Sequence, residues 1–201
     1  MSKVAVFEYF PDTSKIKVNL PEGAQSEIEI NPGWAFGKGN HPTTKLCIKA
    51  LEELFQRQKI ETVLDVGCGS GVLSMVSATL GAQYVVGVDI DNAITLEANS
   101  NIEKNGFSST IKVILGSIDD VPGQFDLVVA NILIDSIIAI SEDLSEKAGP
   151  EGMILLSGIR DEQKIRAIEK FSKLGYGLNN EYQEKEWVAL IFVKQVFFDR
   201  N

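Results

Sequence analysis

The sequence places a glycine-rich turn directly after an apolar run, at Val63–Gly71, which reads VLDVGCGSG. Glycine lets the backbone come close to a ligand, and the first N–H groups of a following helix point toward that ligand. The spacing is G-x-G-x-G, whereas dinucleotide-binding turns read G-x-G-x-x-G. An acidic residue inside the strand would repel a pyrophosphate and attract an ammonium group. We therefore expect a zwitterionic or cationic ligand here, bound by Asp65, Gly67, Gly69 and Gly71.

A second carboxylate ends the next apolar run, Tyr84–Asp89. Asp89 follows the glycine turn by about twenty residues, the position from which an acidic side chain can accept hydrogen bonds from both ribose hydroxyls of an adenosine. Taken alone, the turn could join a strand to a helix without a ligand, and Asp89 could cap the next helix. Because the turn and both acids occur together, we predict a nucleoside cofactor with Asp89 as its ribose ligand.

Asn131 follows a later apolar run, Phe125–Ala130, and is the candidate for binding an acceptor group. In open α/β sheets, ligands lie across the carboxyl ends of the strands near the point where the strand order reverses. The side-chain carbonyl of Asn131 and the backbone carbonyl of Ile132 could accept hydrogen bonds from an amine and orient its lone pair. We expect these two to be the catalytic residues; the alternative is that Asn131 caps the next helix.

Three aromatic residues and one lysine are weaker candidates. His41 is the only histidine and stands beside Pro42, so it is either a general base or a helix-start residue. Attack by a neutral amine needs alignment more than a strong base, so the chemistry considered for Asn131 does not require His41. We place Trp34 and Lys38 at the entrance, and expect Trp187 to pack as a strand residue at the sheet edge.

Apolar runs and helical patterns alternate from Thr62 onward, and these elements must position the candidate residues. Such alternation predicts a parallel sheet with crossover helices. The last two strands are close enough in sequence to form an antiparallel hairpin. We expect strands at Thr62–Val66, Tyr84–Asp89, Ile111–Leu115, Phe125–Ala130, Met153–Ser157, Leu178–Tyr182 and Trp187–Val193, and helices at Val72–Leu80, Ala93–Asn105, Ile134–Ala148 and Glu162–Leu174.

The first part of the chain predicts a small β appendage or hairpin, because short alternating stretches at Val4–Phe7, Ile16–Val18 and Ile28–Ile30 are separated by proline and glycine. The next ten residues contain too many glycines for a regular element. A helix is expected from Thr43 to Gln56, with Pro42 at its start. We therefore expect an appendage over residues 1–31 and a cofactor-binding domain over residues 32–201.

Bulk composition is ordinary for a globular protein, at 44% hydrophobic and 23% charged residues in a chain of 201. The sequence has neither an apolar run of about eighteen residues nor a basic and apolar leader, so we expect no membrane span or secretory signal. Cys47 and Cys68 are too few for a disulfide framework and too far apart for a metal-binding knuckle. The sequence therefore predicts a cytoplasmic protein without a bound metal.

The charge balance favours basic partners, since 28 Asp and Glu outnumber 19 Lys and Arg and the formal net charge is −9. An acidic surface repels the phosphate backbone of nucleic acids. The same surface attracts a basic protein or a cationic small molecule. We therefore expect no direct contact with nucleic acid.

Several separated motifs resemble those of the ribosomal protein L11 methyltransferases, over about Asn31 to Val193. The resemblance is carried by Asn31–Thr44, Asp65–Gly71, Gly87–Asp91, Ala130–Leu133, Leu156–Ile159 and Glu186-Trp187. It implies a Rossmann-like class I methyltransferase with a seven-stranded, mostly parallel sheet, an antiparallel last strand and helices on both faces. It also implies contacts to S-adenosylmethionine from Thr44, Gly67, Asp89 and Asn131. The implied product is an N-methylated lysine or N-terminal amine on a protein, first of all ribosomal protein L11.

Two features depart from this family. Its members usually carry a separate N-terminal domain that binds the ribosomal protein, whereas this sequence has only thirty residues before Asn31. The usual Phe-Gly-Thr-Gly also reads Phe36-Gly37-Lys38-Gly39. We expect the Phe36–Thr44 loop to close over the cofactor. The alternatives are a methyltransferase of the same fold acting on a small molecule or another protein, a cofactor-binding module without catalysis, and a dehydrogenase, which Asp65 and the glycine spacing disfavour.

Overall fold

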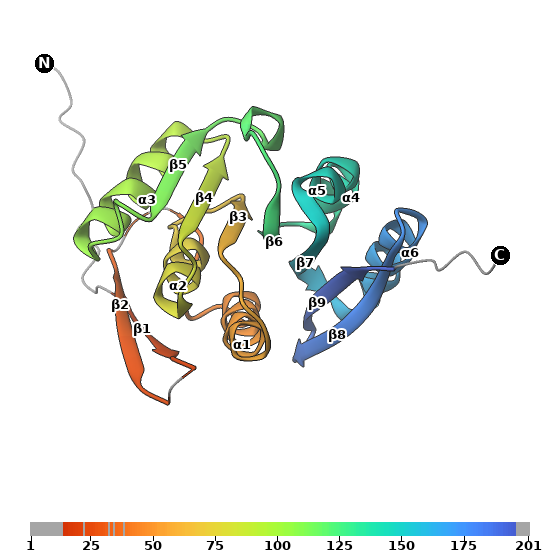
Figure 1. The fold of residues 1–201 in the computed structure, drawn as a ribbon, viewed down its shortest axis with the longest axis horizontal. Helices are drawn as coiled ribbons and strands as arrows, with labels where there is room; N and C mark the ends of the chain where they lie inside the picture. Colours follow the sequence, from red (N-terminus) through yellow and green to blue (C-terminus); the bar gives the residue numbers. More distant parts are fainter. Residues whose placement is uncertain (1–13, 22, 32, 34, 38, 196–201) are drawn as a thin grey trace, which may run out of the picture.

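The computed structural model describes residues 14–21, 23–31, 33, 35–37 and 39–195 (Figure 1). The expected stretch Val4–Phe7 and the candidates Trp34 and Lys38 lie outside the described residues. The elements in chain order are β1 (Ser14–Asn19), β2 (Gln25–Ile30), α1 (Pro42–Arg57), β3 (Thr62–Val66), α2 (Val72–Leu80), β4 (Tyr84–Asp89), α3 (Asn92–Lys104), β5 (Ile111–Leu115), η1 (Ile118–Asp120), β6 (Phe125–Asn131), α4 (Ile134–Ala139), α5 (Ser141–Lys147), β7 (Ala148–Arg160), η2 (Asp161–Gln163), α6 (Lys164–Lys173), β8 (Tyr176–Glu184) and β9 (Trp187–Lys194).

The main sheet has seven strands in the order β5-β4-β3-β6-β7-β9-β8. The pairs among β5, β4, β3, β6 and β7 are parallel, and β9 is antiparallel to both β7 and β8. The expected mostly parallel sheet with an antiparallel last strand is therefore confirmed. The chain builds outward from β3 through β4 to β5 and then returns to β6 on the other side of β3. This reversal puts the carboxyl ends of β3 and β6 side by side, where a ligand site is expected.

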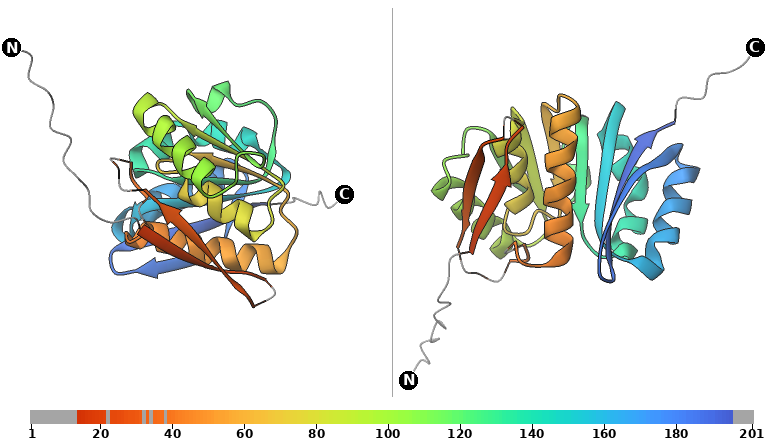
Figure 2. Two further views of the ribbon diagram at one scale, coloured as in Figure 1. Left: turned by 90° about the vertical axis from the view of Figure 1, so that its left-hand side faces the viewer. Right: turned by 90° about the horizontal axis from the view of Figure 1, so that it is seen from below.

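Two hydrophobic cores lie on the two faces of this sheet, because successive strand residues point to opposite sides. In β3, Val63 belongs to one core and Leu64 to the other. Helices α1, α2 and α3 cover the first face, and α4, α5 and α6 cover the second (Figures 1 and 2). The expected helices on both faces are thus confirmed.

Helix α2 is buried on almost every side, and its composition explains this. Its sequence VLSMVSATL has no charged residue, and Val72, Met75 and Val76 are at most 2% exposed. A helix that is apolar all round is stable only inside a core. Glycines with positive φ stand at both ends, Gly71 (79°) and Gly81 (117°). The sheet, α1 and the β1–β2 hairpin therefore hold α2, and with it the glycine turn at its start.

The expected single helix over Ile134–Ala148 is wrong. Ile140 leaves helical geometry at φ −105° and ψ 18°, which separates α4 from α5. The hydroxyl of Ser141 donates to the Ile138 carbonyl at 2.9 Å, a local side-chain bond that competes with the helical ladder. Ala148 also belongs to β7, which begins earlier than the sequence pattern suggested.

The β1–β2 hairpin packs on the same face of the sheet as α1, α2 and α3 (Figure 2). Ile16, Val18 and Ile28 are buried in the core shared with these helices. The side-chain amide of Asn105 accepts a hydrogen bond from the Glu29 N–H at 2.9 Å and donates one to the Glu29 carbonyl at 2.7 Å. The hairpin part of the expected appendage is thus present, and the boundary at residue 31 stays a prediction. Within the described ranges, no helix has the length and apolar character needed to cross a membrane.

Candidate active site

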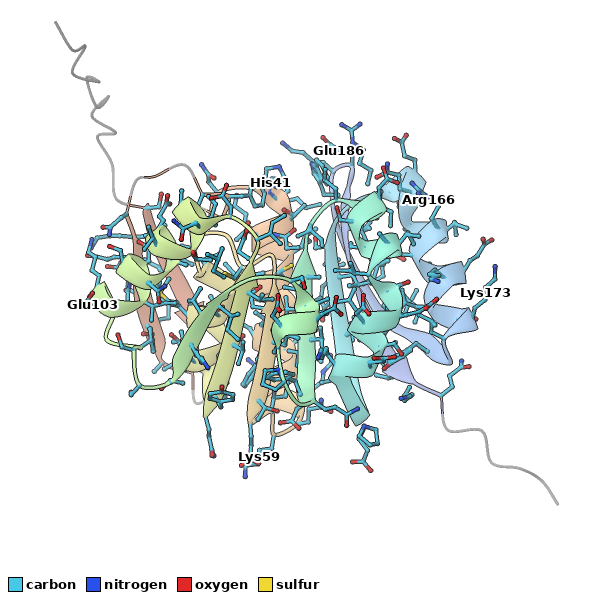
Figure 3. All side chains as sticks on the ribbon, turned by 90° about the horizontal axis from the view of Figure 1, so that it is seen from above. His41, Lys59, Glu103, Arg166, Lys173 and Glu186 are labelled. Atoms are coloured by element: carbon cyan, nitrogen blue, oxygen red, sulfur yellow. The ribbon has the colours of Figure 1, made fainter. Side chains whose placement is uncertain are left out.

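A cavity of about 650 Å³ lies at the carboxyl ends of β3, β4, β5 and β6. Its volume is in the range of sites that hold cofactors and drug-sized ligands. In Figure 3, His41 and Glu186 are labelled at this end of the molecule, and Lys59, which precedes β3, is labelled at the opposite end. The lining includes Phe36, His41, Thr43, Gly67, Gly69, Asp89, Ile90, the Gly116–Asp119 turn, Asn131, Ile132, Leu133, Ser136, Ile140, Asp143, Gly158 and Trp187.

The glycine turn forms one wall of the cavity. The N–H groups of Gly67 and Cys68 both donate to the Val88 carbonyl, at 2.8 and 3.1 Å, which ties the turn to β4. Gly69 has a φ of 56°, and a Cβ at this position would lie 2.6 Å from the Phe36 carbonyl oxygen. Gly71 does not line the cavity. It starts α2 and faces α3, so its part in ligand binding stays a prediction.

Asp89 lies beside the turn and lines the cavity. One carboxylate oxygen accepts from the Gly69 N–H at 3.2 Å, and the other accepts from the Asp91 N–H at 3.1 Å. The helix-cap role considered for Asp89 belongs instead to Asp91, whose side chain accepts from the N–H groups of Ala93 and Ile94. Asp89 is therefore free to bind hydroxyl groups with its remaining lone pairs, and the ribose contact stays a prediction.

Asp65 is buried behind the turn and is not part of the cavity lining. One of its oxygens accepts from the backbone N–H and the hydroxyl of Ser74, at 3.0 and 2.7 Å. Burial raises the pKa of Asp65 from 3.8 to about 6; the Ser74 bonds oppose this shift and the negative charge of Asp89 adds to it. The observed role of Asp65 is to hold the first turn of α2, and its contact with a ligand ammonium stays a prediction.

This raised pKa predicts how stability depends on pH. The folded protein binds the Asp65 proton more tightly than the unfolded chain, so the neutral form favours folding. The contribution is fully present below pH 4 and is lost as pH rises through 6, by at most about 3 kcal/mol. Urea denaturation of the wild type and of Asp65→Asn should show a stability difference that changes over this window. A difference that is constant from pH 4 to pH 7 would contradict the prediction.

Asn131 ends β6, and its side-chain oxygen is buried without a hydrogen-bond partner among the described residues. Leu133 occupies the cap position of α4, and no side chain caps that helix. The capping alternative for Asn131 is therefore wrong. A buried acceptor without a hydrogen bond costs about 1–3 kcal/mol of stability. A ligand that donates a hydrogen bond to this oxygen would remove that cost. Asn131 and Ile132 both line the cavity, as the sequence predicted.

An aromatic wall closes the cavity on the side of α1. Nδ1 of His41 accepts from the Thr43 N–H at 3.3 Å, which makes His41 the cap of α1 and confirms the helix-start interpretation. The His41 ring packs edge-on against Phe36 and Trp187, with centroid distances of 5.1 and 5.2 Å. Trp187 lies in a strand as expected, but not at the sheet edge, because β8 is the edge strand; it faces the cavity instead.

Thr44 is fully buried in α1, and its hydroxyl has no hydrogen-bond partner in the described part of the chain. Its neighbour Thr43 lines the cavity, whereas Thr44 does not. The contact between Thr44 and the cofactor stays a prediction. The described residues also contain no group of three His, Cys, Asp or Glu that could hold a metal ion.

Sequence reasoning missed two groups of lining residues. The Gly116–Asp119 turn follows β5, whose carboxyl end lies at the same edge as those of β3 and β4, so topology alone could have found it. Ser136, Ile140 and Asp143 come from α4 and α5. No local sequence pattern marks these residues. The break at Ile140 separates α4 from α5, and the sequence does not predict the direction of α5 after it.

The family model described as "Ribosomal protein L11 methyltransferase (PrmA)" matches residues 13–195. The chain belongs to the ribosomal protein L11 methyltransferase family. A family member from Geobacter metallireducens is 42% identical over 172 residues, which cover 86% of this chain and 56% of the relative. One from Thermotoga neapolitana is 39% identical over 164 residues, covering 82% of this chain and 61% of the relative. The chain thus spans little more than half the length of these relatives.

Solved structures show the same fold. The ribosomal protein L11 methylase from Lactobacillus delbrueckii subsp. bulgaricus has a TM-score of 0.76 and 31% identity, covering 83% of this chain and 84% of that structure. A 16S rRNA N2 G1207 methyltransferase from T. thermophilus, solved with AdoMet and guanosine, has a TM-score of 0.71 and 23% identity. The match covers 91% of this chain and 51% of that structure. At this identity, the likeness supports the fold and not the function. The class I methyltransferase fold expected from the sequence is confirmed.

Proposed function

We propose that this chain binds S-adenosylmethionine in the cavity and transfers its methyl group to an amino group of a protein, with ribosomal protein L11 as the first candidate. The observation that carries the proposal is the buried side-chain oxygen of Asn131, which lies at the cavity wall beside the glycine turn and has no hydrogen-bond partner among the described residues. Membership in the family supports the reaction, and the names of the relatives support the acceptor.

The residues around the cavity fit this cofactor. Gly67 and Gly69 line the cavity without side chains, so the turn could approach the methionine end through its backbone. Asp89 has acceptor capacity for the ribose hydroxyls, and the Ser117–Asp119 turn borders the space for the adenine. When bound, S-adenosylmethionine supplies a methyl group that its sulfonium centre makes electrophilic.

Asn131 and Ile132 then position the acceptor. A neutral primary amine has two N–H donors and one lone pair, and two carbonyl oxygens can hold both donors. The Asn131 side-chain oxygen and the Ile132 carbonyl would in this way leave the lone pair directed at the methyl carbon. Holding two reacting atoms at a near-attack distance contributes most of the rate in such a transfer. Neither residue needs to act as a base, because the surplus amine proton can pass to solvent after the transfer.

The charge of the chain supports a basic protein as the acceptor. Three of the lining residues, Asp89, Asp119 and Asp143, are carboxylates, and the whole chain has a net charge of −9. Such a surface raises the rate at which a lysine-rich partner approaches. The expectation that nucleic acid is not a direct partner stays a prediction.

The direct test uses the purified chain, radiolabelled S-adenosylmethionine and recombinant ribosomal protein L11, with small amines as alternative acceptors. We expect label in L11 and a mass increase of whole methyl groups on amine-bearing residues. Label in a small amine but not in L11 would support the alternative small-molecule enzyme. Cofactor binding without any product, in these assays and in a cell lysate, would contradict the proposal and favour a binding module.

A further inference from the structure

The residue that presents the second acceptor carbonyl, Ile132, is enclosed by two glycines. Gly158 has a φ of 79°, and a Cβ at this position would lie 2.2 Å from the Ile132 oxygen, 2.7 Å from its carbonyl carbon and 3.0 Å from its nitrogen. On the other side, a Cβ at Gly67 would lie 2.5 Å from Cγ2 of Ile132. Real Cβ atoms essentially never lie under 3.0 Å from other atoms, so a side chain at either position would force a shift, and at Gly158 that shift falls on backbone atoms.

Gly158 reaches this position because β7 bulges at its carboxyl end. Ser157 still pairs with Asn131 across the β6–β7 ladder. On the other side of β7, the register with β9 shifts between Leu156 and Ile159. The extra residue of a bulge bends the strand and redirects the chain locally. The buried hydroxyl of Ser157 donates to the Val188 carbonyl at 2.8 Å, which anchors the bulge to β9.

We propose that Gly158 is a positioning residue for methyl transfer. Its missing side chain lets the β7 bulge pack directly against the Asn131–Ile132 backbone, and this contact determines where the Ile132 carbonyl meets the acceptor amine. The inference rests on the proposed function, because it concerns the same acceptor site. Gly158 acts through Ile132 and needs no contact with the reacting atoms.

The expected size of the effect follows from geometry. A Cβ that starts 2.2 Å from an oxygen has to be relieved by a shift of about 1 Å, since contacts under 3.0 Å essentially never occur. The three nearest atoms all belong to the Ile132 backbone, so no flexible side chain can absorb the shift. A misplacement of about 1 Å can lower the rate of an aligned transfer by about 100-fold. The glycine turn that borders the proposed cofactor site lies near only the side chain of Ile132, so cofactor affinity should change far less than kcat.

The experiment compares Gly158→Ala with Gly106→Ala, which is a closely matched control. Gly106 has a φ of 77°, so alanine suffers the same backbone strain there, and a Cβ would meet nothing within 4 Å. Gly106 is also not part of the cavity lining. We expect Gly158→Ala to lower kcat on L11 by about 100-fold, with the Kd for S-adenosylmethionine within about threefold of the wild type. Gly106→Ala should retain kcat.

A spectroscopic readout tests the positioning without any turnover. In protein labelled with ¹³C-carbonyl isoleucine and ¹⁵N-leucine, only Ile-Leu peptide bonds give a carbonyl–amide correlation, and the sequence has three, at Ile114-Leu115, Ile132-Leu133 and Ile154-Leu155. Gly158→Ala should shift the Ile132 signal and leave the Ile114 signal in place. Gly106→Ala should move neither the Ile132 nor the Ile154 signal.

The outcomes separate this inference from the proposed function. A wild-type chain that binds cofactor but methylates nothing would contradict the proposed function. An active wild type with equal kcat in the two glycine variants, and an unmoved Ile132 signal, would overturn the inference alone. If Gly158→Ala does not fold, Ser157→Ala tests the same bulge, because it removes the anchoring bond without adding an atom. It should then lower kcat and move the Ile132 signal at unchanged cofactor Kd, and failure of both effects would overturn the inference.

Discussion

Replacement of Asn131 by alanine should lower kcat by about 100-fold and change the Kd for S-adenosylmethionine far less, although a contact between Asn131 and the cofactor stays a prediction. The proposed role of the side-chain oxygen is to hold one N–H of the acceptor amine, an interaction that matters only when the acceptor is aligned. The variant should fold normally, because the deleted oxygen has no hydrogen-bond partner among the described residues. Steady-state kinetics with L11, together with calorimetric titration of the cofactor, measure the two quantities separately.

The matched control for this variant is Asn131→Asp. It retains an oxygen acceptor at the same place, so it should keep more activity than Asn131→Ala once the amine is bound. Its activity should also depend on whether the new carboxyl is ionised, since a protonated carboxylic acid can donate toward the amine. Unchanged turnover in Asn131→Ala would exclude Asn131 as the acceptor ligand and leave the Ile132 carbonyl as the remaining candidate.

The second large effect is expected for Asp89→Ala, which should raise the Kd for S-adenosylmethionine by at least about 100-fold. Hydrogen bonds to a charged group contribute about 1.5–3 kcal/mol each, and the proposed ribose contact has two. The variant also loses the bond between the carboxylate and the Gly69 N–H, 3.2 Å long, which helps to shape the turn. Calorimetric titration with the cofactor and with its demethylated product would measure the loss.

Asp91→Ala is the control for charge and for local folding. Asp91 stands two positions away, carries the same charge and caps α3 through the N–H groups of Ala93 and Ile94. Its loss should reduce the free energy of unfolding by about 1 kcal/mol and leave the cofactor Kd nearly unchanged. Equal losses of affinity in the two variants would mean that Asp89 acts through net charge or loop stability, and would contradict its role as the ribose ligand.

The elements near the site were predictable because short stretches of sequence determine them. The expected bounds of β3, α2, β4 and β5 match the structure to the residue. Each of these strands is a short, mostly apolar run that ends at or just before a glycine or an acidic residue, and α2 is an uncharged, mostly apolar helix between two glycines. The break at Ile140 was missed because the helical apolar pattern continues across it; the structure places the Ser141–Ile138 hydroxyl bond at this point.

The sequence by itself determined the parallel core, the glycine turn and the placement of Asp89 and Asn131 at strand ends, because side-chain period and strand direction decide these features locally. Only the tertiary structure decided which candidates meet. It brings His41 and Trp187 into contact and sets Asp65 behind the cavity. It also shows that Asp91, and not Asp89, caps α3. It also presses Gly158 against Ile132. The reason is that strand order and a β-bulge, which create these contacts, arise from pairing between segments far apart in the chain.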